Sequence, residues 1–330
     1  MVDTHELVGV LADGKFHSGE RLASRFGVSR AAVWKRLRRL SQDTGLRVDA
    51  VRGRGYRLAE SLELLDARRL AARLVDRHAN VCERFWVLPS VDSTSAFLAR
   101  QPAPRPGRAH VCLAEHQREG RGRRGRRWTS GYGTNILMST AWHFDRPLAA
   151  LSALSLAVGV AVAEALTGLG LRNHGLKWPN DILVDGRKLA GILVEASGEI
   201  AGPARAVVGI GLNMRVTTEV AAHIDQPWVD LADLGAAGLS RNTVAEALVS
   251  AVLEACGEFD AVGVEGFLAR WRAYDCLLGR EVRLLLGAGR EVLGRYDGLD
   301  PSGGLRLAGE SGVRTYHAGE VSLRGSFAAS

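Results

Sequence analysis

The sequence is poor in lysine, in cysteine and in uninterrupted apolar stretches. Its four cysteines are scattered, without a CxxC pair or Cys/His ligand spacing, which argues against a zinc site or a disulfide framework. The longest apolar run, residues 149–166, is interrupted by Ser152, Ser155, Gly159 and Glu164, so it predicts a buried core helix and not a membrane span. The first residues lack an apolar signal region. We therefore expect a cytoplasmic protein with no membrane contact and no bound structural metal.

The scarcity of lysine draws attention to the few lysines that remain. Of 43 basic residues, 39 are arginine, and the lysines are Lys15, Lys35, Lys177 and Lys188. A lysine ammonium is a compact point charge that can meet a phosphate or carboxylate where the broad guanidinium cannot. A functional role for some of these four residues is one interpretation, and chance retention is the other.

The positive charge is concentrated at one end of the chain. The 330 residues are enough for two or three domains, and the net charge is +7. Residues 1–58 hold 12 basic and 6 acidic side chains, a balance of +6, so the remainder is nearly neutral. This local excess is typical of a nucleic-acid-binding arm, and its end predicts a domain boundary near residues 59–65.

Residues 17–40 have the pattern of a helix-turn-helix. Two short helices are expected to meet at Gly27, with Ser18 and Ser29 as N-caps. Strands near 46–51 and 56–58, joined by the basic turn 52–55, would complete a winged helix. A solvated charged helix in a protein-interaction domain is the alternative, but it leaves the basic turn unexplained.

In the second helix Val33, Leu37 and Leu40 recur at helical spacing, as expected for a core stripe, and arginines and lysine populate the other faces. Such a basic face can enter the major groove of DNA. The DNA-binding residues that we predict in this helix, its cap and the wing are Ser29, Arg30, Lys35, Arg36, Arg39, Arg52 and Arg54.

From residue 62 to about 274, predicted strands and helices alternate, which favours a mixed sheet with packed helices and an overall α+β fold class. The predicted strands are 85–88, 111–115, 135–143, 172–177, 187–196 and 205–213, and the predicted helices are 149–169 and 243–259.

Residues 118–127 form an arginine- and glycine-rich segment that no packed element could bury. Six arginines and three glycines would give a loop able to approach and close over a phosphate, and Trp128 at its end offers a flat face for stacking a base. The spacing matches neither a Walker loop nor the dinucleotide-binding fingerprint. Taken alone, such a segment is also typical of RNA-binding or disordered regions.

A second polar cluster surrounds residues 177–195. Asp185-Gly186 predicts a two-residue hairpin between antiparallel strands. Lys177 and Lys188 lie on either side of Asn180 and Asp181, and two lysines with an amide and a carboxylate could hold a small carboxylate and a phosphate together. For Trp178, Leu189, Ile192 and Val194, a place in the core is the better interpretation.

After Gly279 the pattern changes to short strands and turns, which predicts a small antiparallel barrel. The expected strands are 281–286, 291–296, 305–308 and 313–317, with turns at 287–289 and 301–304. Its mixed charge favours a structural or protein-docking role over nucleic-acid binding.

Four ordered motifs together resemble the biotin protein ligase family, in the bifunctional form that is also a transcriptional repressor. They are GRGRRGRRW at 120–128, KWPND at 177–181 with RKLAGILVE at 187–195, Asp92-Ser-Thr94, and Gly209-Ile-Gly-Leu-Asn213. The resemblance implies a winged helix at 1–62, a catalytic domain related to class II aminoacyl-tRNA synthetases at 63–275, and an SH3-like barrel at 276–330.

The resemblance also implies a set of functional residues. The catalytic residues would be Lys188, Lys177, Arg123 and Asp181. The biotin and adenylate would be bound by Ser93, Thr94, Ser95, Gln117, Arg121, Gly122, Arg123, Trp128, Asn180, Lys188, Gly209, Gly211 and Asn213. Ser95 departs from the family pattern, which has Asn after Ser-Thr, and this places one polar contact in doubt.

The implied reaction joins biotin and ATP, with Mg²⁺, into biotinyl-5′-AMP and transfers biotin to a lysine of the biotin carboxyl carrier protein of acetyl-CoA carboxylase. Its barrier is largely repulsion between anions, which lysines, arginines and the metal ion would neutralise. The adenylate-bound homodimer would bind operator DNA and repress biotin synthesis genes. Lipoate protein ligase and a ligand-sensing regulator without ligase activity are the alternatives.

Overall fold

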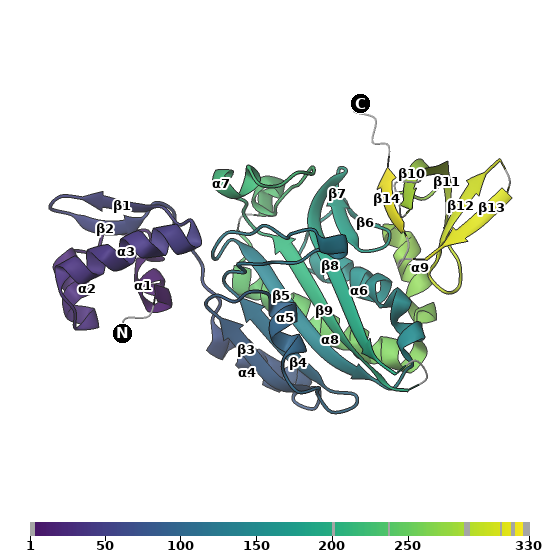
Figure 1. Cartoon of the computed structure of the whole chain (residues 1–330), viewed down its shortest axis with the longest axis horizontal. Coiled ribbons are helices and arrows are strands. Elements are labelled where there is room, and N and C mark those ends of the chain that lie inside the picture. The colour runs from purple at the N-terminus through teal and green to yellow at the C-terminus, as the bar shows by residue number, and fades with distance from the viewer. Residues whose placement is uncertain are drawn as a thin grey trace.

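The computed structural model describes residues 4–199, 202–236, 238–286, 291–310, 312–317 and 321–325. These residues form three units in chain order: an N-terminal unit of helices and a two-stranded sheet, a large central sheet with helices, and a small C-terminal sheet (Figure 1). The order and type of the three units agree with the α+β architecture predicted from the sequence.

The N-terminal unit is the predicted winged helix-turn-helix. Ser18 and Ser29 cap their helices by accepting hydrogen bonds from the backbone of Arg21 and Ala32, and Gly27 makes the turn with a φ of 61°. An additional first helix, which the sequence analysis missed, supplies buried leucines to the core. The elements are α1 (Thr4–Leu11), α2 (Gly19–Phe26), α3 (Arg30–Thr44), β1 (Val48–Val51) and β2 (Gly55–Leu58).

The central unit is built on a seven-stranded sheet of order β3-β4-β5-β9-β8-β7-β6, in which only β3 and β4 are parallel. The strands are β3 (Cys82–Leu88), β4 (Ala109–Ala114), β5 (Asn135–Phe144), β6 (His174–Lys177), β7 (Asp181–Val184), β8 (Arg187–Gly198) and β9 (Ala204–Asn213). β7 and β8 are antiparallel and joined at Asp185-Gly186, where both φ values are positive, so the predicted hairpin is confirmed.

The two faces of this sheet differ in what covers them. Side chains alternate along a strand, so successive residues point to opposite faces. Val208, Ile210 and Leu212 of β9 belong to the main apolar core with α6 and α8, whereas Val207 packs with Leu98 of α5 on the other face. Figure 1 shows α6 and α8 behind the sheet and α5 in front of it. The front face is only partly covered.

Helices in the central unit include one long apolar segment. Leu148–Gly168 is long and apolar enough to cross a membrane by composition, but 67% of its window is buried inside the protein. It divides into a 3₁₀ turn and α6, so the core-helix prediction is confirmed. The helical segments are α4 (Ala67–His78), α5 (Thr94–Ala99), η1 (Arg123–Gly125), η2 (Leu148–Ala153), α6 (Leu154–Gly168), α7 (Thr218–Ala221), η3 (Ala232–Ala236), α8 (Arg241–Val262) and α9 (Glu265–Tyr274).

The C-terminal unit is a five-stranded antiparallel sheet of order β13-β12-β11-β10-β14. Its strands follow the predicted pattern, with β14 in addition, and the turn expected at 287–289 lies outside the described residues. The strands are β10 (Glu281–Leu286), β11 (Glu291–Leu299), β12 (Leu305–Gly309), β13 (Gly312–Tyr316) and β14 (Val321–Gly325).

The winged helix is seated against the central unit at two places. Tyr132, from the segment after the arginine- and glycine-rich loop, is 2% exposed inside the winged-helix core, and its hydroxyl lies 2.8 Å from Nδ1 of His5. The connecting segment is held by Glu63, which accepts hydrogen bonds from Ser240 and Arg241 at the start of α8. The central unit therefore contributes directly to the core of the winged helix.

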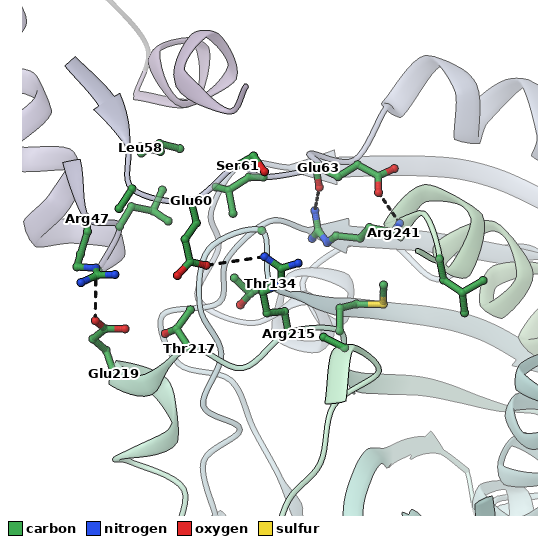
Figure 2. Close-up of a pocket in the computed structure, with 18 of the residues that line it drawn as sticks. Arg47, Leu58, Glu60, Ser61, Glu63, Thr134, Arg215, Thr217, Glu219 and Arg241 are labelled. Carbon is green, nitrogen blue, oxygen red and sulfur yellow. Dashed lines mark hydrogen bonds and ion pairs between the residues drawn. The ribbon is translucent and has the colours of Figure 1, made fainter. Parts of the chain in front are cut away.

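A cavity of about 230 Å³ lies beside this connection, between the two units. Figure 2 shows ion pairs across it, Arg47 to Glu219 at 3.8 Å and Arg215 to Glu60 at 3.9 Å. Arg241 closes its far side, where the guanidinium is buried against Glu115 and hydrogen-bonds the backbone oxygen of Glu63.

Candidate active site

The candidate site lies on the partly covered front face of the sheet, where three strands bring small residues together. Gly211 of β9 is paired with Leu137 of β5 on one side and Gly191 of β8 on the other. In the next row Gly209 lies between Ser139 and Leu193. These rows point away from the main core, because their neighbours Ile210 and Leu212 point into it. The glycines leave space above the sheet for other groups.

A cluster of hydroxyls occupies the space above Gly209. Thr94 and Ser95, at the start of α5, each lie within hydrogen-bond distance of the Ser139 hydroxyl, at 2.7 and 2.9 Å. Gln117 accepts hydrogen bonds from the backbone and the hydroxyl of Thr94 through its Oε1, which leaves its amide nitrogen to donate elsewhere. All three hydroxyl residues are buried. The cluster is a rigid, neutral polar wall suited to the head group of a small polar ligand.

Two lysines share one carboxylate beside this wall. Lys188 Nζ lies 2.7 Å from Oδ1 of Asp181, and Lys177 Nζ lies 3.7 Å from Oδ2. Lys177 and Asp181 are register partners across the turn between β6 and β7. Burial lowers the pKa of Lys177, the charge of Lys188 lowers it further, and Asp181 opposes both effects. With one carboxylate between two ammonium groups, the cluster keeps net positive charge for an anion.

The arginine- and glycine-rich loop contributes further cations. Arg123 donates from Nη1 to Oδ1 of Asn180 at 3.2 Å, and Arg121 is paired with Glu195 at 4.0 Å. Asn180 is itself fixed to β8, because its amide donates to the backbone oxygen of Ile192. Burial lowers the pKa of Arg123, which stays cationic because an arginine titrates far above neutrality.

Trp128, at the end of the loop, lies directly over the glycines of β8 and β9. A Cβ atom on Gly211 would be 2.3 Å from Cε2 of the indole, and one on Gly191 would be 3.2 Å from Cζ3. Lys188 Nζ is 5.7 Å from the centroid of the indole ring. Gly209 thus makes room for Ser95 and Gly211 for Trp128, and both glycines also line the first pocket.

Trp128 and Lys188 line two adjoining pockets and separate them. The first pocket contains the hydroxyl cluster, Gln117, Asn180 and the loop residues Arg121–Arg123. The second contains Asn213 and the segment from His223 to Trp228. One pocket thus has a neutral polar wall and the other an aromatic wall, and the only cation that they share is Lys188. A group bound in each would meet at the Lys188 ammonium.

The structure brings the predicted binding residues together, with some differences of place. All of them except Asn213 line the first pocket, and Asn213 lines the second. Asn213 donates to the backbone oxygens of Lys188 and Val229, so it also fixes the backbone at Lys188. Of the predicted catalytic residues, Lys188 and Arg123 line a pocket, whereas Lys177 and Asp181 line neither of the two pockets. Lys177 is connected to the site only through Asp181, whose other carboxylate oxygen contacts Lys188.

Two groups of site residues were missed by sequence reasoning. Ser139 is a buried polar residue that follows the apolar run Ile136–Met138 in β5, and that change was a signal that could have identified it. The segment 223–228 has no such signal. It is placed by pairing between Trp228 and Lys188 and by the hydrogen bond from the backbone of Val229 to that of Lys188, which depend on the folded chain.

The candidate DNA-binding surface is the outer face of α3 and the wing. Arg30, Lys35 and Arg39 are exposed on α3, as predicted. Arg36 departs from the prediction, because it adjoins the core stripe of α3, is half-buried and has its Nη1 shielded from solvent. Arg38 is exposed in its place. Ser29 is the helix cap, and in the wing Arg52 is exposed while Arg54 stacks on Phe16 at 4.2 Å.

Three sequence-family models match the chain, one in each unit. Residues 5–57 match a helix-turn-helix domain, residues 87–213 match the biotin/lipoate A/B protein ligase family, and residues 277–324 match the biotin protein ligase C-terminal domain. Every residue that lines the first pocket lies within the second of these matches.

Curated relatives extend the match over the whole chain. The bifunctional ligase/repressor BirA of Salmonella typhimurium is 40% identical over 96% of both chains, and that of Escherichia coli is 38% identical over 97% of this chain and 96% of its own. Among solved structures, the biotin protein ligase of Aquifex aeolicus in complex with biotin and ATP superposes with a TM-score of 0.61 at 28% identity, covering 74% of this chain and 100% of that one. The chain therefore belongs to the biotin protein ligase family.

Proposed function

We propose that this chain is a bifunctional biotin protein ligase and repressor. As a ligase it activates biotin with ATP to biotinyl-5′-AMP and passes the biotin to a lysine of a carboxylase carrier domain. As a repressor it binds operator DNA through the winged helix. The observation that carries the ligase proposal is the pair of pockets that meet at Lys188 and Trp128.

The geometry supports a mechanism of positioning and charge neutralisation. Biotin would lie against the hydroxyl cluster and Gln117, and the adenine would lie in the second pocket beside Trp128. The biotin carboxylate then attacks the α-phosphorus of ATP and pyrophosphate leaves. Lys188 and Arg123 offset the repulsion between the two anions, and Asp181 orients Lys188. No protein nucleophile is needed.

Magnesium would enter with ATP. The described residues contain no group of three or more His, Cys, Asp or Glu side chains that could hold a metal ion. The site instead presents ammonium and guanidinium groups, which suit a triphosphate that brings its own cation. Magnesium bound to the phosphates would add to the neutralisation of charge during attack.

Replacing Lys188 by Ala tests the ligase proposal. We expect biotin-dependent release of pyrophosphate to be lost, because the cation shared by the two pockets is removed, while circular dichroism reports an intact fold. Lys15→Ala, at an exposed lysine of the winged helix, is the matched control and should keep full activity. Biotin and lipoate assayed side by side decide the substrate. Activation of lipoate alone, or unchanged pyrophosphate release by Lys188→Ala, would overturn the proposal.

The repressor proposal is supported by the exposed basic face of α3 and the wing. We further propose that the adenylate orders the arginine- and glycine-rich loop and favours a homodimer, whose paired winged helices fit a two-fold operator. A cytoplasmic location and domain boundaries at residues 62 and 275 belong to the same proposal.

Gel-shift titration of the full chain tests this linkage. A duplex enriched from a random pool by the full chain serves as the operator, and affinity is measured with and without biotin and ATP. We expect at least tenfold tighter binding when both are present, which corresponds to about 1.4 kcal/mol. Equal affinity in all conditions contradicts the linkage but leaves the ligase proposal untouched.

A further inference from the structure

Trp34, on the DNA-facing helix, has an exposure that the fold does not explain. It is 51% exposed, and it is the only aromatic side chain among the large exposed hydrophobic residues that the structure describes. The core stripe of α3 is complete without it, since Val33, Leu37 and Leu40 are buried. An exposed indole that adds nothing to the core marks a contact surface.

The surroundings of Trp34 are cationic. From Arg30 to Gln42 the helix carries no acidic residue, and the first carboxylate, Asp43, is paired with Arg39 at 3.3 Å. The Arg38 guanidinium carbon lies 5.6 Å from the centroid of the Trp34 ring, one helical turn further on. Exposed arginine and lysine around an aromatic side chain fit a polyanion that also presents apolar groups.

The position of Trp34 within the helix selects the kind of contact. It is the fifth residue after the Ser29 cap, one turn from both Arg30 and Arg38. In a helix-turn-helix, the amino-terminal half of the second helix reaches the base edges in the major groove. Arg52 in the wing is exposed beside β1 and suits a phosphate contact. Trp34 therefore lies where bases, and not only phosphates, are in reach.

We propose that Trp34 is a specificity-determining residue of the operator contact: its indole packs on the 5-methyl group of a thymine in the major groove. Arg38, stacked on the same indole, is thereby oriented toward the neighbouring base pair, where it donates to the O6 and N7 acceptors of guanine. Thymine is the only base with an apolar group in this groove, and arginine is the commonest reader of guanine. The inference rests on the proposed repressor function and adds the base that it recognises.

The test combines a Trp34→Ala variant with removal of single methyl groups from DNA. The full chain, with biotin and ATP, selects a duplex from a random pool, and each thymine is then replaced in turn by deoxyuridine. For the unaltered chain we expect about a tenfold loss of affinity at one thymine in each half-site. Trp34→Ala should bind the thymine duplex about tenfold more weakly and show no further loss with deoxyuridine at that position.

Arg52→Ala is the matched control. If Arg52 contacts phosphate, its loss weakens binding of all sequences alike, lowers the salt dependence and keeps the deoxyuridine penalty. Thermal unfolding of Trp34→Ala, and a second variant Trp34→Gln, show whether the winged helix stays folded.

Several results would overturn the inference. One is a Trp34→Ala variant with the same deoxyuridine penalties as the unaltered chain. Another is a change in the dimerisation constant without a change in base preference, which would make this face a protein contact. If the unaltered chain enriches no sequence at all, the repressor proposal fails with it. Specific enrichment without a thymine penalty removes only the role of Trp34.

Discussion

The two carboxylate oxygens of Asp181 contact two different lysines, Oδ1 with Lys188 and Oδ2 with Lys177. Lys188 lines both pockets, whereas Lys177 is half-buried and lines neither of them. If Lys177 loses its proton, Asp181 draws more strongly on Lys188 and less positive charge remains for the anions. We therefore expect the net charge of this cluster to depend on the protonation of Lys177.

This arrangement predicts an alkaline limit on adenylate formation. Lysine is charged below its pKa, and burial lowers the pKa of Lys177, so its charge is lost at a lower pH than the usual value of about 10.5. We expect the rate of pyrophosphate release to fall as the pH rises through the lowered pKa of Lys177. Lys177→Arg should keep the charge and extend the plateau to higher pH, while Lys15→Arg should leave the profile unchanged. Superimposable profiles for all three proteins would contradict this role.

Arg123 predicts a second effect, on retention of the intermediate. Its contact with Asn180 ties the loop to the sheet beside the first pocket. We expect Arg123→Gly to release biotinyl-adenylate into solution, with a half-life of the bound intermediate at least tenfold shorter, because one charged hydrogen bond contributes about 1.5–3 kcal/mol. Rapid filtration measures this. Arg124→Gly is the control, since Arg124 is exposed and its φ of 58° suits glycine. Equal half-lives would remove Arg123 from this role.

Most residues of the first pocket were predicted from the sequence, because they fall in short motifs. The exceptions are Met138, Gly191, Ile192, Leu193 and Ile210. The sequence could not predict that Lys177 is a step removed from the pocket, since that depends on the turn between β6 and β7. Nor could it place Trp228, which reaches the site through its pairing with Lys188 on β8.

Among the secondary-structure elements, β8 and β9 together provide the floor on which Trp128 rests. Their glycines are register partners at positions 191 and 211, and larger side chains would lift the indole away from the sheet. The wall between the two pockets is therefore set by the backbone of two strands.

Gly211→Ala tests this floor. The added methyl would be 2.3 Å from the indole, so Trp128 must shift, and overpacking of this kind costs about 1–3 kcal/mol. We expect the Kd for ATP to rise about tenfold, measured by titration calorimetry. Gly168→Ala, at the end of α6 with nothing within 4 Å of the added atom, should bind ATP normally. An unchanged Kd for Gly211→Ala would show that Trp128 does not need this position.

Several elements escaped sequence reasoning for different reasons. α5 has six residues, too few for a helical period to be recognised. β6 begins at His174 and not at Arg172, because Asn173 adopts a left-handed conformation with a φ of 61°. α4 could have been found: Asp66 caps it, and Leu70 and Leu74 follow at helical spacing.

On the scale of the whole molecule, Tyr132 joins the catalytic loop to the DNA-binding unit. It lies four positions after Trp128 in the sequence, and its ring is part of the winged-helix core. The order of the three units was predictable from charge and motifs. This contact was not, since it joins residues 127 positions apart and neither partner carries a recognisable pattern.

Tyr132→Ala should uncouple the two units. Removing a buried aromatic side chain costs about 3–5 kcal/mol, so we expect the winged helix to unfold at lower temperature, in a separate calorimetric transition. Where it remains folded, operator affinity should depend less on biotin and ATP. Tyr132→Phe keeps the packing and loses only the contact with His5, so it should stay close to the unaltered chain. A single unchanged transition for Tyr132→Ala would argue against the coupling.

The Tyr132 contact also has a consequence in the opposite direction. A coupling free energy between two sites is reciprocal. If the adenylate raises the affinity for DNA by some factor, DNA raises the affinity for the adenylate by the same factor. The operator is then an effector of the enzyme. A chain bound to its operator would retain the adenylate longer than a chain free in solution, and would therefore transfer biotin to a carrier more slowly.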